Sequence, residues 1–302
     1  MENAMPQLNS PVGLAIVAPS GAPLDDAAVL TAVTRLQQQG FQVHQYYQPE
    51  QRFQRFGAGD AQRVAQIHAA ANNPAVQVVM ALRGSYGLSR LMPLLDWDLL
   101  ANCGKTFVGY SDFTLMHQAL LARGCRSIAG PMLCDDYTRD DQSAYTQGQF
   151  LNCLQQAQHE LEFVTDFESD LQVSGRLWGG NLAMLAHAVG TPYAHSEEGG
   201  ILFLEDIGEH PYRVERMLLQ LHYAGVLKQQ KAIVLGDFSG YRLASHDHGY
   251  DFAAMLTYLR SIVSVPVVTG LPFGHIRERC SLVVGAEAEL ILVQQEARLI
   301  MR

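Results

Sequence analysis

The regular alternation of apolar runs with amphipathic stretches in the first half of the chain is the feature that most constrains its fold. Strands that alternate with helices are typical of a parallel sheet covered by helices. The apolar and helical segments lie, in chain order, at residues 12–18, 25–39, 42–46, 60–71, 76–82, 106–109 and 113–123. The pattern predicts an α/β fold that begins with a parallel-sheet, Rossmann-like domain. Ligands of such sheets bind at the loops that follow the strands.

The length of 302 residues favours two domains, because one domain typically holds roughly 100 to 200 residues. Polar and acidic sequence after residue 135 marks the junction. We predict an N-terminal α/β domain over residues 1–155, a linker over 156–172, and a C-terminal α/β domain, rich in β-strand, over 173–302. The helical and apolar segments of the C-terminal domain are at residues 181–189, 201–204, 211–224, 232–236, 252–261 and 265–268.

Charge and cysteine content argue against several classes of function. The chain has 30 acidic and 21 basic residues, a formal charge of −9, and no run of lysine and arginine, so its surface would repel nucleic acid. It begins without the pattern of a signal peptide, and no apolar run approaches the roughly 18 residues that span a membrane. Five widely spaced cysteines include no Cys-x-x-Cys pair, which argues against disulfides and thiolate zinc. We expect a cytoplasmic protein without a cofactor and without a nucleic-acid or membrane partner.

Ser111 is a candidate nucleophile. It lies in the sequence Gly-Tyr-Ser-Asp-Phe at residues 109–113, between an apolar strand and a helix. In that setting a tight turn exposes a serine oxygen above a sheet. The usual nucleophile elbow has glycine where this chain has Phe113. The alternative is that Ser111 caps the following helix by accepting a hydrogen bond from a backbone amide, and the motif alone leaves both interpretations open.

A serine nucleophile needs a base, and the base needs an acid to orient it. Glu205 directly follows an apolar strand, and His275 lies in the loop after the strand at 265–268. The alternatives are a solvated loop carboxylate and a structural histidine, one of 11 in the chain. If both residues are catalytic, Ser111 comes from the first domain and its partners come from the second. We therefore expect the triad to assemble across the domain interface.

The glycine-rich sequence Arg-Gly-Ser-Tyr-Gly at residues 83–87 follows a predicted strand. Its glycines would let backbone amides approach a substrate oxygen closely, which suggests an oxyanion hole. A phosphate cradle is the competing functional interpretation, but the loop has neither the P-loop nor the dinucleotide-binding glycine pattern. The remaining alternative is a turn without a functional role.

Several motifs resemble those of one known family, the murein tetrapeptide LD-carboxypeptidases, which are serine peptidases. They occur in the same order and spacing over nearly the whole chain. The motifs are APSG at 18–21, RGSYG at 83–87, GYSDFT at 109–114, LWGGNLAML at 177–185, LEDIGEHPYRVERMLLQL at 204–221 and TGLPFGH at 269–275.

The resemblance implies a Ser-His-Glu triad at Ser111, His275 and Glu205. It also implies an oxyanion hole of backbone amides, which we place at Asp112 and at the turn of Gly84 and Ser85. The family loop is commonly Arg-Gly-Gly-Tyr-Gly, so Ser85 departs from the pattern, which puts the amide assignment in doubt if the backbone there has a positive φ. Family members remove the terminal D-alanine that follows diaminopimelate in cytoplasmic muropeptides during cell-wall recycling. The resemblance also suggests a homodimer.

A carboxypeptidase must bind a free carboxylate, and arginine does so with two parallel hydrogen bonds. The arginines near the predicted loops are Arg83, Arg213, Arg277 and Arg279. Our candidate substrate-binding residues are Arg83, Tyr86, Trp178, Asn181 and Arg213, although Trp178 also fits a buried position beside a helix start. We predict no metal site.

The cluster of His246, Asp247, His248 and Asp251 has the only plausible set of metal ligands, but its spacing matches no standard zinc pattern and its context is typical of a surface loop.

Other functions are compatible with parts of this pattern. The nearest alternative is a serine peptidase of the microcin-immunity type, which cleaves aminoacyl-nucleotide conjugates and typically has longer loops. A nucleotide-dependent oxidoreductase or a non-catalytic binder of small ligands would also use an α/β sheet with glycine-rich loops. Replacing Ser111 by alanine distinguishes these classes, because only a serine hydrolase depends on that hydroxyl.

Overall fold

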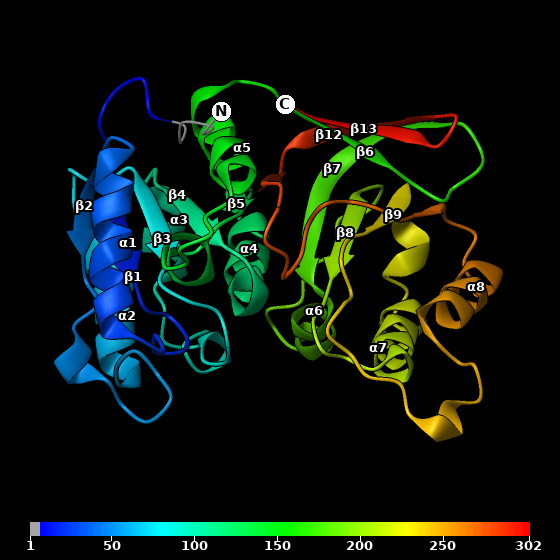
Figure 1. The fold of residues 1–302 in the computed structure, drawn as a ribbon, viewed down its shortest axis with the longest axis horizontal. Coiled ribbons are helices and arrows are strands. Elements are labelled where there is room, and N and C mark those ends of the chain that lie inside the picture. Colours follow the sequence, from blue (N-terminus) through cyan, green and yellow to red (C-terminus); the bar gives the residue numbers. More distant parts are fainter. Residues whose placement is uncertain (1–6) are drawn as a thin grey trace. The chain divides into compact units, whose positions relative to one another are not determined.

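A computed structural model describes residues 7–302 and divides the chain into two compact units. Unit 1 contains the chain up to Ala157 together with Arg277–Val283, and unit 2 contains Gln158–Ile276 together with Val284–Arg302. Each unit combines a sheet with helices, so the predicted α/β class is confirmed (Figure 1). The expected linker, 156–172, holds a strand of unit 2, and the chain returns to unit 1 late in the sequence.

The sheet of unit 1 has six strands in the order β11-β5-β4-β3-β1-β2. Their bounds are β1 Val12–Val17, β2 Phe41–Gln45, β3 Val78–Ala81, β4 Thr106–Gly109, β5 Ser127–Ala129 and β11 Leu282–Val284. The five strands from β5 to β2 pair in parallel, as predicted from the alternating pattern. The chain leaves β1 toward β2 on one side and returns to β3 on the other. The loops after β1 and β3 therefore flank the point where the strand order reverses, where such sheets bind ligands.

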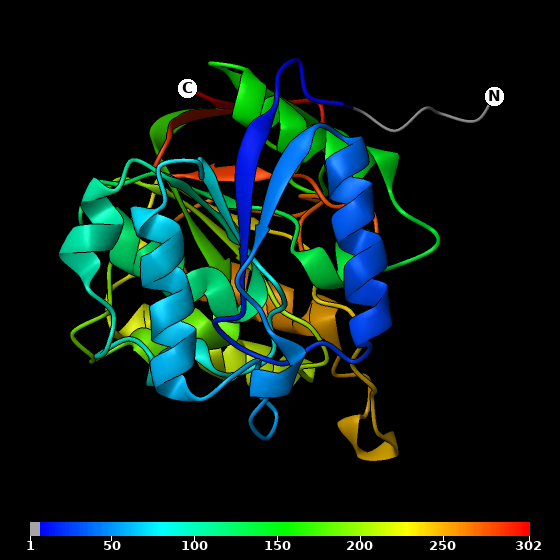
Figure 2. The same ribbon diagram turned by 90° about the vertical axis from the view of Figure 1, so that its left-hand side faces the viewer.

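The helices of unit 1 cover both faces of its sheet. They are α1 Asp26–Gln38, α2 Asp60–Asn72, α3 Trp97–Asn102, α4 Thr114–Leu121 and α5 Ala144–Gln155. α1 and α2 lie on opposite faces (Figure 2), and α3 contacts both α2 and α4. The Asp25 side chain caps α1, and α1 buries Val29, Ala32 and Leu36 at the three- and four-residue spacing of an amphipathic helix.

The sheet of unit 2 has seven strands in the order β10-β9-β8-β7-β12-β13-β6. Their bounds are β6 His159–Val164, β7 Leu171–Asn181, β8 Ile201–Glu205, β9 Ala232–Leu235, β10 Val267–Val268, β12 Glu287–Val293 and β13 Glu296–Met301. Strands β7 to β10 pair in parallel, whereas β12, β13 and the first half of β7 pair antiparallel. The carboxyl ends of the four parallel strands therefore meet at one edge of the sheet.

The helices of unit 2 are α6 Leu182–Ala188, α7 Pro211–Tyr223 and α8 Phe252–Ile262. α7 contacts both α6 and α8 (Figure 1). It begins with proline, which is favoured at the first helical position. Val214, Leu218 and Leu221 of α7 are buried, so the apolar stripe predicted on this helix serves core packing.

Among residues 7–302, no helix combines the length and the apolar character that crossing a membrane requires.

His117 is a buried histidine directly below the end of β4. It lies on α4 with no exposed surface, and its ring contacts Ser127 Oγ at 2.8 Å and the Gly109 carbonyl oxygen at 2.9 Å. Burial disfavours the imidazolium and lowers the pKa of His117 from 6.5 to about 4, although the hydrogen bond to Gly109 opposes this shift. The ring therefore supports the strand end as a neutral group.

This burial makes the stability of the protein depend on pH. As the pH falls from 7 to 4.5, the unfolded chain protonates this histidine but the folded chain does not, so the contribution to stability present above pH 6.5 is lost on the way down to about pH 4. We expect the free energy of unfolding to fall by about 2 kcal/mol more in the wild type than in His117→Gln. Urea unfolding at both pH values measures this difference. The exposed His246→Gln control should keep the wild-type dependence, and equal dependence in His117→Gln would contradict the account.

Candidate active site

Ser111 lies at a strained turn between β4 and a short helix, η3, Ser111–Phe113. Its φ of 62° is in the left-handed region, which costs a residue with a side chain roughly 1–2 kcal/mol. Its side chain is partly exposed and makes no hydrogen bond within unit 1. Neither η3 nor α4 is capped by a side chain, so Ser111 is not used as a helix cap. A strained serine between a strand and a helix is the arrangement of a nucleophile elbow.

Asp112, the next residue, holds two loops against this turn. It is 2% exposed, and its Oδ2 accepts hydrogen bonds from Ser20 Oγ at 2.5 Å and from the Leu88 amide at 2.7 Å. Ser20 follows β1 and Leu88 follows β3, and the Gly21 amide also donates to the Gly84 carbonyl at 3.0 Å. The loops after β1, β3 and β4 therefore meet at Ser111.

Arg63 of α2 also links the loops that follow β1 and β3. It has no exposed surface, and its guanidinium donates to the carbonyls of Pro19 and Gly87 and pairs with Asp60. Burial lowers the pKa of Arg63, and the bond to Asp60 opposes this effect. The role of Arg63 could not be predicted from the sequence, because an arginine on an amphipathic helix normally faces solvent.

The glycine-rich turn after β3 approaches Ser111 closely. A Cβ added to Gly84 would lie 3.0 Å from Ser111 Cβ and 3.1 Å from Ser111 Oγ. Ser85 has a φ of 70°, so serine occupies a left-handed position that favours glycine. Within unit 1 the amides of Gly84 and Ser85 donate no hydrogen bond, whereas Ser85 Oγ accepts one from Arg55 at 2.9 Å. Two amides beside the serine are therefore available to an acceptor.

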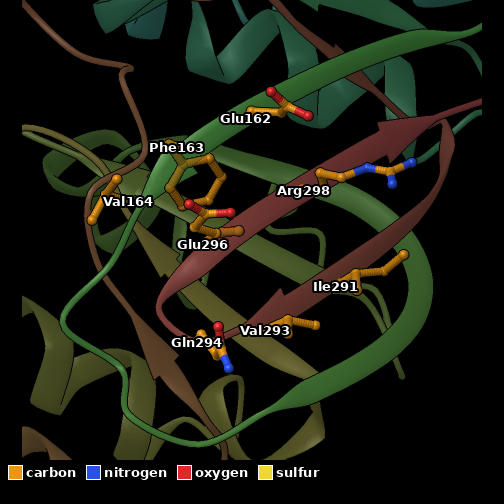
Figure 3. A pocket seen from close by; sticks show the side chains of 9 residues that line it. Glu162, Phe163, Val164, Ile291, Val293, Gln294, Glu296 and Arg298 are labelled. Atoms are coloured by element: carbon orange, nitrogen blue, oxygen red, sulfur yellow. The ribbon is translucent and has the colours of Figure 1, made fainter.

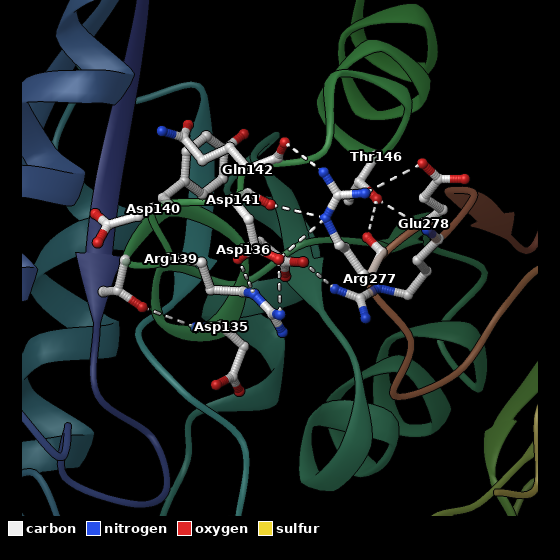
Figure 4. Close-up of polar contacts among 12 residues, drawn as sticks. Asp135, Asp136, Arg139, Asp140, Asp141, Gln142, Thr146, Arg277 and Glu278 are labelled. Atoms are coloured by element: carbon white, nitrogen blue, oxygen red, sulfur yellow. Dashed lines mark hydrogen bonds and ion pairs between the residues drawn. The ribbon is translucent and has the colours of Figure 1, made fainter.

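The segment that returns to unit 1 packs against Tyr110, the residue before Ser111. The Arg279 guanidinium lies 3.8 Å from the centroid of the Tyr110 ring and pairs with buried Asp136. Burial raises the pKa of Asp136, and the charge of Arg279 opposes that shift. The Arg277 carbonyl accepts a hydrogen bond from Thr146 Oγ1 at 2.8 Å (Figure 4). Arg279 is 1% exposed and therefore fills a structural role rather than the carboxylate-binding role considered from the sequence.

In unit 2, Glu205 and His275 form a hydrogen-bonded pair. Glu205 is the last residue of β8 and has no exposed surface, and its Oε2 lies 2.8 Å from His275 Nδ1. Because a carboxylate only accepts hydrogen bonds, Nδ1 carries the proton and Nε2 is left as an acceptor. The His275 side chain is 19% exposed. The pair therefore has the tautomer of a general base oriented by an acid.

The loop after β10 carries His275 to the end of β8. It first crosses the end of β9, where the Leu271 amide donates to Leu235 and Phe273 accepts from the Asp237 amide at 2.8 Å. A Cβ at Gly236 would lie only 2.2 Å from the Phe273 carbonyl oxygen, so this crossing depends on glycine. Neighbouring strand ends thus place Glu205 and His275 together although they are 70 residues apart.

Asn181 and Asp206 extend this pair into a buried network. Asn181 Nδ2 donates to Glu205 Oε1 at 3.1 Å and to Asp206 Oδ1 at 3.0 Å. Burial, followed by the charge of Glu205, raises the pKa of Asp206 to about 6. Asn181 therefore bridges two carboxylates, which favours a positioning role over the substrate contact expected from the sequence. Asp206 was missed, although a second carboxylate directly after Glu205 was a visible signal.

The remaining candidates differ in their exposure. Trp178 is 1% exposed and donates from Nε1 to Gln230 at 2.8 Å, as expected for the buried position that was the alternative to a substrate contact. Tyr86 is 45% exposed next to Ser85. Arg83 is partly buried and donates to the Ala22 carbonyl at 2.7 Å. Arg213 is half exposed and pairs with Glu209. Tyr86, Arg83 and Arg213 remain predicted substrate contacts.

The cluster considered for metal binding has other partners. Asp247 accepts hydrogen bonds from the Ala244 amide and contacts the His210 ring, and Asp251 caps α8. In the part of the chain that the structure describes, no three His, Cys, Asp or Glu side chains form a group able to hold a metal ion.

A pocket elsewhere in unit 2 contains none of the candidate residues. It lies on the face of β6, β12 and β13 and is lined by side chains that include Phe163, Ile291 and Arg298 (Figure 3).

Comparison with known proteins gives a consistent result. Residues 14–130 match the LD-carboxypeptidase N-terminal domain, and residues 174–290 match the LD-carboxypeptidase C-terminal domain. The chain is 32% identical to the murein tetrapeptide carboxypeptidase of Pseudomonas aeruginosa over 87% of each chain. It is 28% identical to a probable murein peptide carboxypeptidase of Bacillus subtilis over 96% of this chain and 92% of the other.

Solved structures show the same relationship. The crystal structure of a muramoyltetrapeptide carboxypeptidase from Oxalobacter formigenes matches with a TM-score of 0.93 and 48% identity, and covers 96% of this chain and 98% of the other. MccF in complex with glutamyl sulfamoyl guanosine matches with a TM-score of 0.87 at 20% identity over 99% of each chain, which shows a shared fold. Two domain matches that span most of the sequence, and relatives named as carboxypeptidases, show that this chain is a carboxypeptidase that belongs to the LD-carboxypeptidase family.

Proposed function

We propose that the protein is a serine LD-carboxypeptidase in which Ser111 is the nucleophile, His275 the base and Glu205 the acid that orients the base. The observation that carries the proposal is the hydrogen bond between buried Glu205 and His275 Nδ1, which leaves Nε2 as an acceptor. The strained turn at Ser111 supplies the complementary partner, a serine whose hydroxyl is not engaged within its own unit. A triad would explain both the orientation of the His275 ring by Glu205 and the strained turn at Ser111.

Chain connectivity supports a triad built from both units. Only Ile276 separates His275 from the segment Arg277–Val283, which belongs to unit 1. Arg279 in that segment packs on the ring of Tyr110, the residue before Ser111. The short connection between His275 and Arg279 supports the proposal of a triad with residues from both units.

In the proposed reaction, Ser111 Oγ attacks the scissile carbonyl carbon while His275 Nε2 accepts the hydroxyl proton. Glu205 stabilises the resulting imidazolium through Nδ1. The tetrahedral intermediate then breaks its C–N bond, and His275 returns the proton to the leaving amine. Water attacks the acyl-enzyme in the same manner, with His275 again taking a proton, and releases the shortened peptide with a new carboxylate.

We place the oxyanion hole at the amides of Gly84, Ser85 and Asp112. Backbone amides that face a developing oxyanion stabilise it without reorganisation during the reaction. The amides of Gly84 and Ser85 have no acceptor within unit 1, and the Gly84 backbone passes close to Ser111 Oγ. The close approach supports this assignment.

The proposed substrate is a murein tetrapeptide, from which the enzyme removes the terminal D-alanine that follows diaminopimelate. The names of the relatives from Pseudomonas aeruginosa and Oxalobacter formigenes support this choice. Arg83 is the proposed partner of the terminal carboxylate, because it follows β3 beside the Ser111 turn and only one of its nitrogens is engaged. Tyr86 and Arg213 are further proposed contacts. A cytoplasmic role in peptidoglycan recycling and a homodimer belong to the same proposal.

Ser111→Ala tests the proposal. We expect the wild type to release D-alanine from L-Ala-γ-D-Glu-meso-diaminopimelate-D-Ala, and the variant to lose at least about 1,000-fold in kcat/KM because no other hydroxyl replaces the nucleophile. Mass spectrometry of the tripeptide product measures both rates.

Ser169→Ala, which removes an exposed hydroxyl from unit 2, should keep wild-type activity. Release of D-alanine by Ser111→Ala at the wild-type rate would exclude the nucleophile. A folded wild type that cleaves aminoacyl-nucleotide conjugates and leaves the tetrapeptide intact would instead favour the microcin-immunity activity, the alternative suggested by the sequence.

Gly84→Ala tests the oxyanion turn. The added methyl group would press on the Ser111 side chain and lie 3.3 Å from Met132 Cε, so the turn must shift. We expect kcat/KM to fall about 100-fold, the size of effect seen when one oxyanion donor is lost. Gly59→Ala is the control, since Gly59 has a φ of −61° and its added Cβ would meet only the exposed side chain of Gln62. A Gly84→Ala enzyme as active as this control would contradict the placement of the oxyanion hole.

A further inference from the structure

Asp206 is a buried carboxyl group beside the acid–base pair that the proposed reaction does not use. It is 4% exposed, and it accepts hydrogen bonds from the Ala183 amide at Oδ2 and the Ile207 amide at Oδ1, both at 2.9 Å. Its Oδ1 also accepts from Asn181 Nδ2 at 3.0 Å. The first turn of α6 and the end of β8 therefore fix this carboxyl group on two sides.

The contacts of Asn181 connect Asp206 to the base. Asn181 Oδ1 accepts a hydrogen bond from the Met184 amide and so caps α6, which directs Nδ2 toward the two carboxyl groups. Nδ2 has two protons, one for Glu205 Oε1 and one for Asp206 Oδ1. Glu205 Oε2 remains for His275. The path from Asp206 to the imidazole thus runs through one amide and one carboxylate.

We propose that Asp206 is a positioning residue for the acid–base pair: through Asn181 it fixes the Glu205 carboxylate against His275, and its negative charge favours the protonated imidazole. This inference rests on the proposed function of His275 as the base. The two carboxyl groups are held close together although their charges repel, and the shared amide donor offsets that repulsion. A second negative charge close to Glu205 stabilises the imidazolium that forms when Ser111 is deprotonated.

Other charged groups near Asp206 have different partners. Asp237 follows β9, and its backbone carbonyl accepts the Asp206 amide, while its carboxylate accepts from Ser239. Glu209, in the loop after β8, pairs with Arg213, and His210 contacts Asp247. His187 lies in the last turn of α6. Burial and then Glu205 are the main causes that raise the pKa of Asp206 to about 6, so Asp206 is ionised above that pH and supports the imidazolium there.

Asp206→Asn, measured at pH 8, removes the charge and keeps the size of the side chain. We expect kcat to fall about tenfold with KM within about twofold, because Asp206 acts on the transition state and does not touch substrate. We also expect the acidic limb of the kcat/KM profile to move to lower pH by about 0.5 to 1 unit, since loss of a nearby negative charge makes the imidazolium easier to deprotonate. Asp251→Asn is the matched control, because Asp251 caps α8 in the same unit through the Ala254 amide.

An NMR titration of the His275 ring distinguishes positioning from a general loss of structure. In Asp206→Asn its midpoint should fall by the same amount, and in Asp251→Asn it should stay at the wild-type value. Asp206→Asn with an unchanged midpoint would overturn the proposal, whether or not kcat falls. The titration uses no substrate, so a failure to cleave the murein tetrapeptide would count against the proposed substrate, whereas an unchanged midpoint would count against the role of Asp206.

Asn181→Ser is a second variant, which tests the path from Asp206 to the base. Serine is also a good helix cap, so α6 keeps its start while the bridge between the carboxyl groups is lost. The double variant combines Asp206→Asn with Asn181→Ser. If Asp206 acts through Asn181, kcat of the double variant should be no more than about threefold below kcat of the more damaging single variant. Losses of kcat that multiply would show independent action and overturn the proposed path.

Discussion

A carboxylate without any exposed surface is stable only where hydrogen-bond donors replace water, and Glu205 is such a carboxylate. Its donors come from separate parts of unit 2: Asn181 ends β7, and His275 follows β10. The parallel order of β7, β8, β9 and β10 brings these positions to one edge of the sheet. Burial of Glu205 therefore requires the same arrangement that orients the imidazole, so the fold of unit 2 and its proposed chemistry depend on one hydrogen-bonded group.

Unit 1 also uses buried charged groups around its proposed catalytic residue. Asp112 accepts hydrogen bonds from two loops, Arg63 donates to the carbonyls of the same two loops, and Arg279 packs beneath Tyr110. Each of these groups is almost fully buried, so removal of one partner would leave a charge or a dipole without compensation. This network holds Ser111 in a backbone conformation that a serine adopts at a cost.

Much of this architecture could be predicted from the sequence, because strongly periodic segments determine their own structure. The parallel strands of unit 1 and the amphipathic helix at Pro211–Tyr223 follow from their apolar patterns. β6 was taken for part of a linker because the sequence around it is polar and acidic. The strand itself, His-Glu-Leu-Glu-Phe-Val, alternates polar and apolar residues. That alternation is typical of an antiparallel strand with one buried face, and β6 pairs with β13, far away in the sequence.

Among the candidate residues, too, roles that depend on contacts between distant segments could not be predicted. Glu205 and His275 were found because both follow apolar strands, and the structure pairs them. Arg63, Asp206 and the return of Arg277–Val283 to unit 1 were missed, since their roles depend on contacts between distant segments. Trp178 was predicted to contact substrate from its place beside a glycine pair. Its hydrogen-bond partner in the core, Gln230, lies 52 residues away in the sequence.

The central claim is that His275 activates Ser111, and covalent labelling with a fluorophosphonate serine reagent tests it most directly. Intact-mass spectrometry and peptide mapping measure the rate and the position of the adduct in the wild type and in His275→Ala. The account predicts one adduct, on Ser111, that forms at least about 100-fold more slowly in the variant because the serine has lost its base. Labelling of Ser111 at the same rate in both proteins, or labelling of a different residue in the wild type, would contradict it.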